Sequence, residues 1–192
     1  MKYRVTTDRL EIEKLIEETY LKSQKEKWYV YIDYADIRTI KKNNTFKFAI
    51  ICDIDKQDKN WKDEFLKTIE SVQMPHSSLK SYVLNFIEGG NVLTITPNDV
   101  SNIRNSLISF KSNDNGINDP IPKNICCLWS ARGSSSIPNN TLQIQLFSAY
   151  EKREEDEKED EKYEKIIEQY RESFIHPTDF PEFILNTFNK TL

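Results

Sequence analysis

Apolar and β-branched residues concentrate between Trp28 and Asp55, a stretch that reads WYVYIDYADIRTI, KKNN and TFKFAIICDID. Both outer segments are rich in β-branched and aromatic residues, which are typical of strands. The polar residues Lys41–Asn44 between them offer the chemistry of a tight turn. The pattern therefore predicts a long β-hairpin that forms the spine of a sheet.

A second hairpin is predicted over residues 81–96. The segments SYVLNFIE and NVLTIT flank Gly89-Gly90, and a glycine pair between two β-prone segments is typical of a tight hairpin turn. Two further strands are predicted at 125–130 and 141–150, separated by a Gly/Ser-rich loop. The later of the two alternates apolar and polar residues.

Apolar residues recur at helical spacing in five other segments. The first begins near Asp8, which can cap a helix together with Glu11 three positions later, as in a capping box. Asn60 offers an N-cap to the second helix. The predicted helices cover residues 8–25, 60–72, 97–110, 163–174 and 179–188.

Helices and hairpins alternate along the chain, without an internal sequence repeat. This order favours helices packed against a sheet whose neighbouring strands are mostly antiparallel. We therefore expect an α+β fold with a mainly antiparallel sheet, or a partly open barrel, flanked by helices. The polar segment 112–124 is the best candidate boundary. It separates an α+β core, 1–111, from a C-terminal extension, 112–192, with two strands, a charged connector and helices packed on the core.

Charge is distributed unevenly along the 192 residues. The formal net charge is −4, and residues 151–165 contain nine acidic and five basic side chains, so the rest of the chain is electrically balanced. Proteins that bind duplex nucleic acid present a broad basic surface. The charge pattern does not predict such a surface.

The sequence contains no apolar segment close to the roughly 20 residues that a membrane-spanning helix needs. Its first residues, MKYRVTTDRLEIEK, lack the apolar core of a signal peptide. We therefore expect a soluble intracellular protein, cytoplasmic or nuclear, that does not contact a membrane. Three cysteines without a CxxC motif and two distant histidines argue against a structural zinc site, and no cofactor is expected. The oligomeric state stays open.

Acidic residues at the end of the predicted spine are candidate metal ligands. Asp53 and Asp55 end one strand and share a face of it, and carboxylates in this position can hold Mg²⁺ against a phosphate substrate. No Gly-rich phosphate loop accompanies them. The alternative is that they are ordinary polar residues where a strand meets a turn.

The segment ICCLWSARG at 125–133 follows YVLNFIEGG by about forty residues. This pair is similar to the strands that carry cysteine and histidine in caspases. The nucleophile position then falls on Ala131, and the histidine position falls on Ile87 or Glu88. The resemblance therefore implies a catalytically dead relative.

Residues 8–111 resemble a second family. An N-terminal helix, the long hairpin VYIDYADIRTIKKNNTFKFAIICDID, a connector with Trp61, the Tyr82–Thr96 hairpin and a helix from Pro97 look like an OB-fold. The nearest members are small subunits of replication protein A and of telomere-capping complexes, although a clear third strand is missing at 56–63. This resemblance implies single-strand binding through aromatic and basic side chains. The candidates are Tyr29, Tyr31, Tyr34, Arg38, Lys41, Lys42 and Lys47.

The helix predicted at 163–174 follows the charged run and has an apolar stripe. Such a stripe packs on its own domain or docks a partner helix. The run before it is typical of a solvated helix or a connector. The candidate partner-binding residues are Tyr163, Ile166, Ile167, Tyr170 and Phe174.

These patterns favour a non-enzymatic protein-interaction or assembly module, one form of which is an OB-like subunit of a single-stranded nucleic-acid or telomere-associated complex. Protein partners are expected, with single-stranded nucleic acid as the second class of ligand. The alternatives are a catalytically dead caspase-like domain and a metal-dependent phosphoryl-transfer enzyme that uses Asp53 and Asp55.

Overall fold

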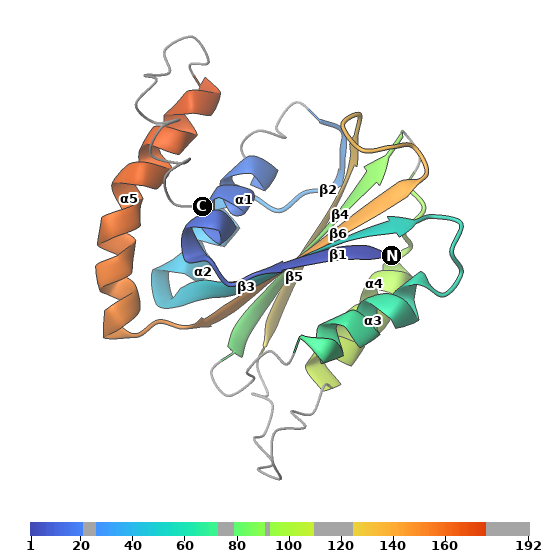
Figure 1. The fold of residues 1–192 in the computed structure, drawn as a ribbon, viewed down its shortest axis with the longest axis horizontal. Coiled ribbons are helices and arrows are strands. Elements are labelled where there is room, and N and C mark those ends of the chain that lie inside the picture. Colours follow the sequence, from blue (N-terminus) through green and yellow to red (C-terminus); the bar gives the residue numbers. More distant parts are fainter. Residues whose placement is uncertain (21–25, 73–78, 91–92, 110–124, 176–192) are drawn as a thin grey trace.

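The computed structural model describes residues 1–20, 26–72, 79–90, 93–109 and 125–175. These residues form five helices and six strands, and the sheet is mostly antiparallel, so the predicted α+β class is confirmed (Figure 1). In chain order the elements are β1 (Lys2–Thr6), α1 (Arg9–Tyr20), β2 (Trp28–Val30), α2 (Tyr34–Asn43), β3 (Asn44–Asp55), α3 (Trp61–Ser71), β4 (Leu79–Gly89), α4 (Pro97–Ser109), β5 (Cys126–Ser134), β6 (Thr141–Glu151) and α5 (Glu154–Ile175).

The strands form one open sheet in the order β1-β3-β6-β4-β5-β2. Among the described strands only the β4–β5 pair is parallel, and α4 lies on the connection between these two strands. The sheet draws strands from both sides of the predicted boundary at residue 112, because β6 lies between β3 and β4.

Helices cover both faces of the sheet: α3 and α4 lie on one side, and α1, α2 and α5 on the other (Figure 1). On the first side, Phe65 of α3 and Ile103 of α4 are fully buried against the strands. On the second side, Ile12 and Ile16 of α1 and Ile37 of α2 are buried in a separate cluster. Among the described residues, none of the helices combines the length and the apolar composition that crossing a bilayer requires.

The prediction of a long hairpin at 28–55 is wrong in its first half. Residues 34–43 form α2, and β2 is only three residues long and pairs with β5 rather than β3. The Asp33 carboxylate accepts a hydrogen bond from the backbone N–H of Ala35 at 3.0 Å, which caps the helix. One face of α2 is buried through Tyr34, Ile37 and Ile40. Capping and helical periodicity therefore outweigh the β-prone composition.

The second predicted hairpin is also wrong. Residues 93–96 form no strand, and β4 pairs with β6 and β5 instead. The buried Glu88 carboxylate accepts the backbone N–H of Thr94 at 2.7 Å and that of Ile95 at 3.0 Å, so a side chain holds this segment in place of a strand partner. A Cβ atom at Gly89 would lie 1.8 Å from the carbonyl oxygen of Pro138, which explains the need for glycine at the end of β4.

Several other predictions are confirmed. Helices begin at Arg9, Trp61 and Pro97, close to their predicted starts, and β6 covers the predicted alternating strand. The charged run joins the amphipathic segment in one helix, α5. β5 extends to Ser134, into the predicted loop, and β1 is a strand that the sequence did not predict. The helix predicted at 179–188 lies outside the described residues.

We predict that Asp33→Ala lowers the free energy of unfolding by about 1 kcal/mol, because the N-cap hydrogen bond of α2 is lost. Asp33→Asn retains an oxygen acceptor at this position and serves as the control, with a stability close to wild type. Urea unfolding at equilibrium measures both changes. Equal stability of all three proteins would contradict the capping role.

Candidate functional site in the cleft between α1, α2 and α5

Helix α5 begins two residues after β6, and the short link between them is fixed to the body of the protein. The backbone N–H of Lys152 donates to the carbonyl oxygen of Asn43 at 3.1 Å. The backbone N–H of Arg153 donates to the Asp156 carboxylate at 2.9 Å. The direction of α5 past α1 and α2 is therefore set within its first turn (Figure 1).

Asp156 connects the first turn of α5 to β3 and α1. Its side chain is buried, and Lys47 Nζ lies 3.0 Å from one oxygen and 2.9 Å from the other. Its backbone carbonyl accepts a hydrogen bond from Arg9 Nη1 at 2.9 Å. Burial opposes ionisation, but the hydrogen bonds from Lys47 and from the Arg153 N–H outweigh it and hold the pKa of Asp156 below its usual value.

Lys47 reaches Asp156 because of an irregularity in β3. The register with β6 shifts between Phe46 and Phe48, which leaves Lys47 as the extra residue of a β-bulge. Phe46 packs in the cluster under α1 and α2, and Lys47 contacts α5 above the same face of the sheet. Two consecutive side chains therefore lie on the same face of the sheet, whereas in a regular strand they would lie on opposite faces.

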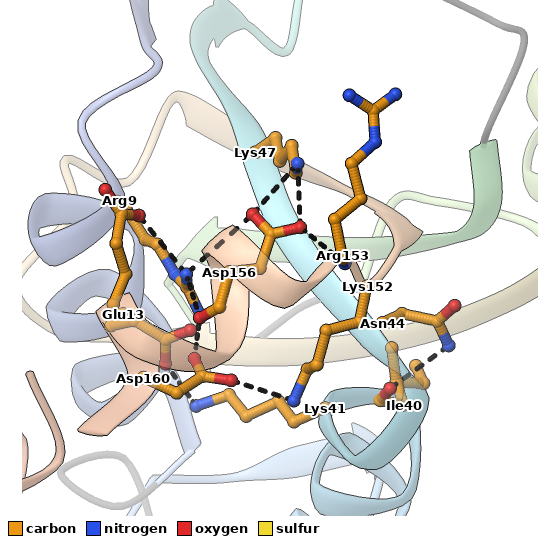
Figure 2. Close-up of polar contacts among 11 residues, drawn as sticks. Arg9, Glu13, Ile40, Lys41, Asn44, Lys47, Lys152, Arg153, Asp156 and Asp160 are labelled. Atoms are coloured by element: carbon orange, nitrogen blue, oxygen red, sulfur yellow. Dashed lines mark hydrogen bonds and ion pairs between the residues drawn. The ribbon is translucent and has the colours of Figure 1, made fainter.

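Arg9 joins α1 to the same part of α5. Its side chain is only 10% exposed, its guanidinium is paired with Asp160, and Glu159 lies 3.3 Å from Nη1. Lys152 Nζ lies 2.8 Å from the other carboxylate oxygen of Asp160. Figure 2 shows Asp156 pointing toward Lys47, and Asp160, one turn later in α5, pointing toward Arg9 and Lys152.

A second group of contacts holds α5 farther along, at Glu17 of α1. The Glu17 side chain is fully buried and accepts hydrogen bonds from Tyr34 and from Arg171 Nη2, the latter at 2.9 Å, with Lys41 Nζ 3.5 Å away. Burial alone would raise the pKa of Glu17, but the Arg171 hydrogen bond, the Lys41 charge and the Tyr34 hydroxyl bring it below its usual value. Next to this group, Tyr170 donates to Glu18.

Between these two groups lies a cleft of about 280 Å³. Its walls carry both signs of charge, with Arg9 and Lys41 on one side and Glu164 and Glu168 on the other. Within the part of the chain that the structure describes, neither of these two glutamates forms an ion pair. The lining residues are Arg9, Glu13, Lys41, Asn44, Asp160, Tyr163, Glu164, Ile167, Glu168 and Arg171.

The predicted nucleic-acid-binding residues lie in two separate places. Lys41 lines the cleft, and Lys47 is paired with Asp156. Tyr34 is buried, with the Arg38 guanidinium 5.2 Å from its ring centroid, and Lys42 is exposed on α2. Tyr29 lies in β2 and Tyr31 just after it, at the edge of the sheet opposite β1.

The predicted partner-binding stripe faces its own domain. Ile167 is buried, Tyr163 lines the cleft beside it, and Ile166 is half-buried. Tyr170 contacts Glu18 of α1, as described above. Phe174 lies outside the residues whose side chains the structure describes. The cleft thus brings together Lys41 from one predicted set and Tyr163 and Ile167 from the other.

The predicted metal ligands Asp53 and Asp55 are exposed at the end of β3. Asp53 accepts a hydrogen bond from Gln143 Nε2 at 2.9 Å, and Asp55 accepts one from the backbone N–H of Gln57 at 3.0 Å. Among the described residues, no group of three or more His, Cys, Asp or Glu side chains could hold a metal ion.

The positions that the caspase resemblance selects lie on the parallel strands β4 and β5. Ala131 pairs in register with Phe86, and Ile87 pairs with Arg132. Ala131, Ile87 and Glu88 are all buried within the sheet.

Sequence reasoning missed most of the charged residues that hold α5, namely Arg9, Glu17, Asp156, Asp160 and Arg171. A signal was present in α5 itself, since Asp156 and Asp160 continue the stripe of Tyr163 and Ile167 backwards at helical spacing. The stripe changes from apolar to acidic along one face, which marks a helix docked partly by charge.

A comparison with models of known protein families finds no match, and a comparison with curated protein sequences finds none either. The geometry of the cleft and of the neighbouring surfaces therefore provides the evidence on function.

We predict that the free energy of unfolding falls as the pH drops below about 4, where unfolded carboxylates take up protons. The pKa values of Glu17 and Asp156 are lowered by folding. Their stabilising contribution is therefore complete above that pH and is lost as the pH falls through the folded-state values. Glu17→Gln should cost about 3 kcal/mol at pH 7, because Lys41 and Arg171 lose a buried counter-charge, and should flatten the acid dependence.

Urea unfolding from pH 7 to pH 3 measures this dependence. Asp63→Asn, at an exposed position of α3, is the matched control and should retain the wild-type profile. A profile of Glu17→Gln that runs parallel to wild type would contradict the assignment.

Proposed function

We propose that this chain is a non-enzymatic protein-interaction or assembly module that binds a protein partner at the cleft between α1, α2 and α5. The observation that carries the proposal is a row of carboxylates, Asp160, Glu164 and Glu168, which follow one another at four-residue spacing along the cleft side of α5. Like charges at this spacing destabilise a helix. Helix stability therefore does not account for the row.

Asp160 is neutralised by Arg9 and Lys152, whereas Glu164 and Glu168 have no such cation among the described residues. A basic partner surface would relieve their repulsion. The rest of α5 strengthens the attraction, because its other exposed charged residues comprise six acids and three lysines. Such a charged surface steers a partner of opposite charge and fixes its orientation.

We predict that Glu164→Lys/Glu168→Lys abolishes partner retention, because the row then repels a basic surface. The immobilised full-length chain is incubated with extract of the native source, and retained proteins are quantified by mass spectrometry at low and high salt. Asp63→Lys/Glu70→Lys makes the same charge change at exposed positions of α3, on the other side of the sheet, and should retain the partner. Equal retention by both variants would contradict the proposal.

Single-stranded nucleic acid is the second candidate ligand, and the observation that favours it lies at β2. Tyr31 is 52% exposed, and its ring meets Trp28 edge-on at 5.2 Å between centroids. Lys27 Nζ lies 5.1 Å from the centroid of the Tyr29 ring. Tyr29 is half-buried, so Tyr31 offers the more accessible ring. Accessible aromatic rings with a cation nearby support base stacking and backbone contact in single-strand-binding proteins.

If this candidate is correct, Tyr29→Ala/Tyr31→Ala should weaken binding of a labelled single-stranded oligonucleotide about tenfold or more, since each lost stacking contact costs about 1–3 kcal/mol. Fluorescence anisotropy at increasing salt measures the affinity, which should fall as salt rises. Tyr3→Ala, at an exposed position on the opposite edge strand, is the control. Absence of binding by the wild-type chain would remove this candidate.

A further inference from the structure

The surface beneath α5 is a groove with opposite charges at its two ends. At the end where α5 begins, the body presents Arg9 and Lys47, which contact Asp156 and Asp160. At the other end it presents Glu17 and Glu18, which contact Arg171 and Tyr170. The order of charges on α5 is complementary to this groove, so the groove selects both a helix and its direction.

The attachment of α5 is mainly polar. Among its described side chains, Ile167 is the only apolar one that is buried, whereas α1 buries Ile12, Ile16 and Tyr20. Packing of an apolar face normally supplies most of the stability of a helix in a protein. A helix that depends instead on partly exposed ion pairs is held more weakly, and its attachment responds to salt.

We propose that the groove is a helix-docking site that α5 occupies within its own chain and that an amphipathic helix of a partner protein can take over. That partner helix carries two carboxylates one turn apart near its start and an arginine near its end, with an apolar residue between them. This inference goes beyond the proposed function, because it concerns the surface that α5 covers, and its partner is an acidic helix that replaces α5 and not the basic surface that the acidic row of α5 would attract.

The charge order of the groove also argues against nucleic acid as the occupant. A strand of phosphates would find Arg9 and Lys47 at one end, whereas Lys41, toward the other end, is already paired with Glu13 and lies 3.5 Å from Glu17. At the other end Glu17 and Glu18 would repel it, and Glu13 would do so within the cleft. An acidic helix that ends in a basic residue satisfies both ends.

Because α5 follows β6 after only two residues, its effective concentration at the groove is high. An external helix can bind only in the fraction of molecules in which α5 has left, so its apparent affinity is reduced by that fraction. Weakening the attachment of α5 should therefore increase the affinity for a helix supplied from outside.

The test uses the full-length chain and a fluorescent peptide with the sequence of residues 152–175. Asp156→Asn/Asp160→Asn weakens the attachment of α5 and should bind the peptide about tenfold or more tightly than wild type, equivalent to about 1.4 kcal/mol. Glu157→Gln/Glu161→Gln changes the charge equally at exposed positions that are also one turn apart, and should bind like wild type. A peptide with the same two Asp→Asn changes should not bind.

Hydrogen exchange of α5 shows whether the helix is released, and protection of β4 and β6 shows that the sheet stays folded. High salt applied to the wild-type chain gives the same release without a substitution, and α5 should lose protection before the sheet does. If α5 is released and the peptide does not bind, the groove is not a docking site. If α5 stays protected in Asp156→Asn/Asp160→Asn and at high salt, the ion pairs do not hold it, and the inference is wrong.

A single-stranded oligonucleotide that displaces the peptide from the Asp156→Asn/Asp160→Asn chain would also overturn the inference, because the surface would then select anions and not a helix. The proposed function is tested separately, since the hydrogen bonds and ion pairs that hold α5 among the described residues do not involve Glu164 or Glu168. Partner retention that depends on these two residues would survive a failure of the peptide experiment.

Discussion

The central position of β6 is the constraint on which both helical layers depend. This strand pairs with β3 along residues 141–151 and with β4 on its other side, so it joins the first half of the sheet to the second. Its alternation directs Ile144 and Leu146 toward α3 and α4, and Phe147 and Ala149 toward α1 and α2. Because α5 follows after two residues, the end of β6 also fixes where the charged helix begins.

Polar side chains on the sheet determine how α1 lies over it. Thr19 donates to Gln145 at 2.9 Å, and Tyr20 donates to Asn85 at 2.6 Å. Ser130 donates to the same Asn85 oxygen, also at 2.6 Å. Buried hydrogen bonds of this kind specify one arrangement, because each unmade bond would cost the desolvation of a polar group. They hold the second half of α1 in place, and α1 in turn presents Arg9, Glu13 and Glu17 to α5.

Much of the fold could be predicted from local patterns, and much of the site could not. The starts of α3 and α4 and the course of β6 follow from periodicity, which is a property of neighbouring residues. Composition does not predict α2, because YADIRTI is β-prone, although Asp33 offers this segment an N-cap. Lys41 and Lys47 were identified from a resemblance, but no local pattern relates Lys47 to Asp156, which is 109 positions away.

For α5, the apolar positions could be predicted from the sequence, but the role of the acidic residues could not. Its apolar positions were visible in the sequence, whereas the role of its acidic first half depends on which cations the sheet and α1 place nearby. The charged run is therefore not only a solvated connector, since Asp156 is 7% exposed and paired. Pairing across the chain decides whether a charged helix is free or attached, and composition alone does not contain that information.

Because of the bulge at Lys47, the number of residues in β3 determines whether α5 is attached through Asp156. Removing Lys47 would restore regular pairing between β3 and β6, because Phe46 and Phe48 already face opposite sides of the sheet and would keep their partners Ala149 and Ser148. The ammonium group opposite Asp156 would disappear without any substitution. Among related genes, a single-codon deletion or insertion at this point would therefore separate chains with an attached helix from chains without one.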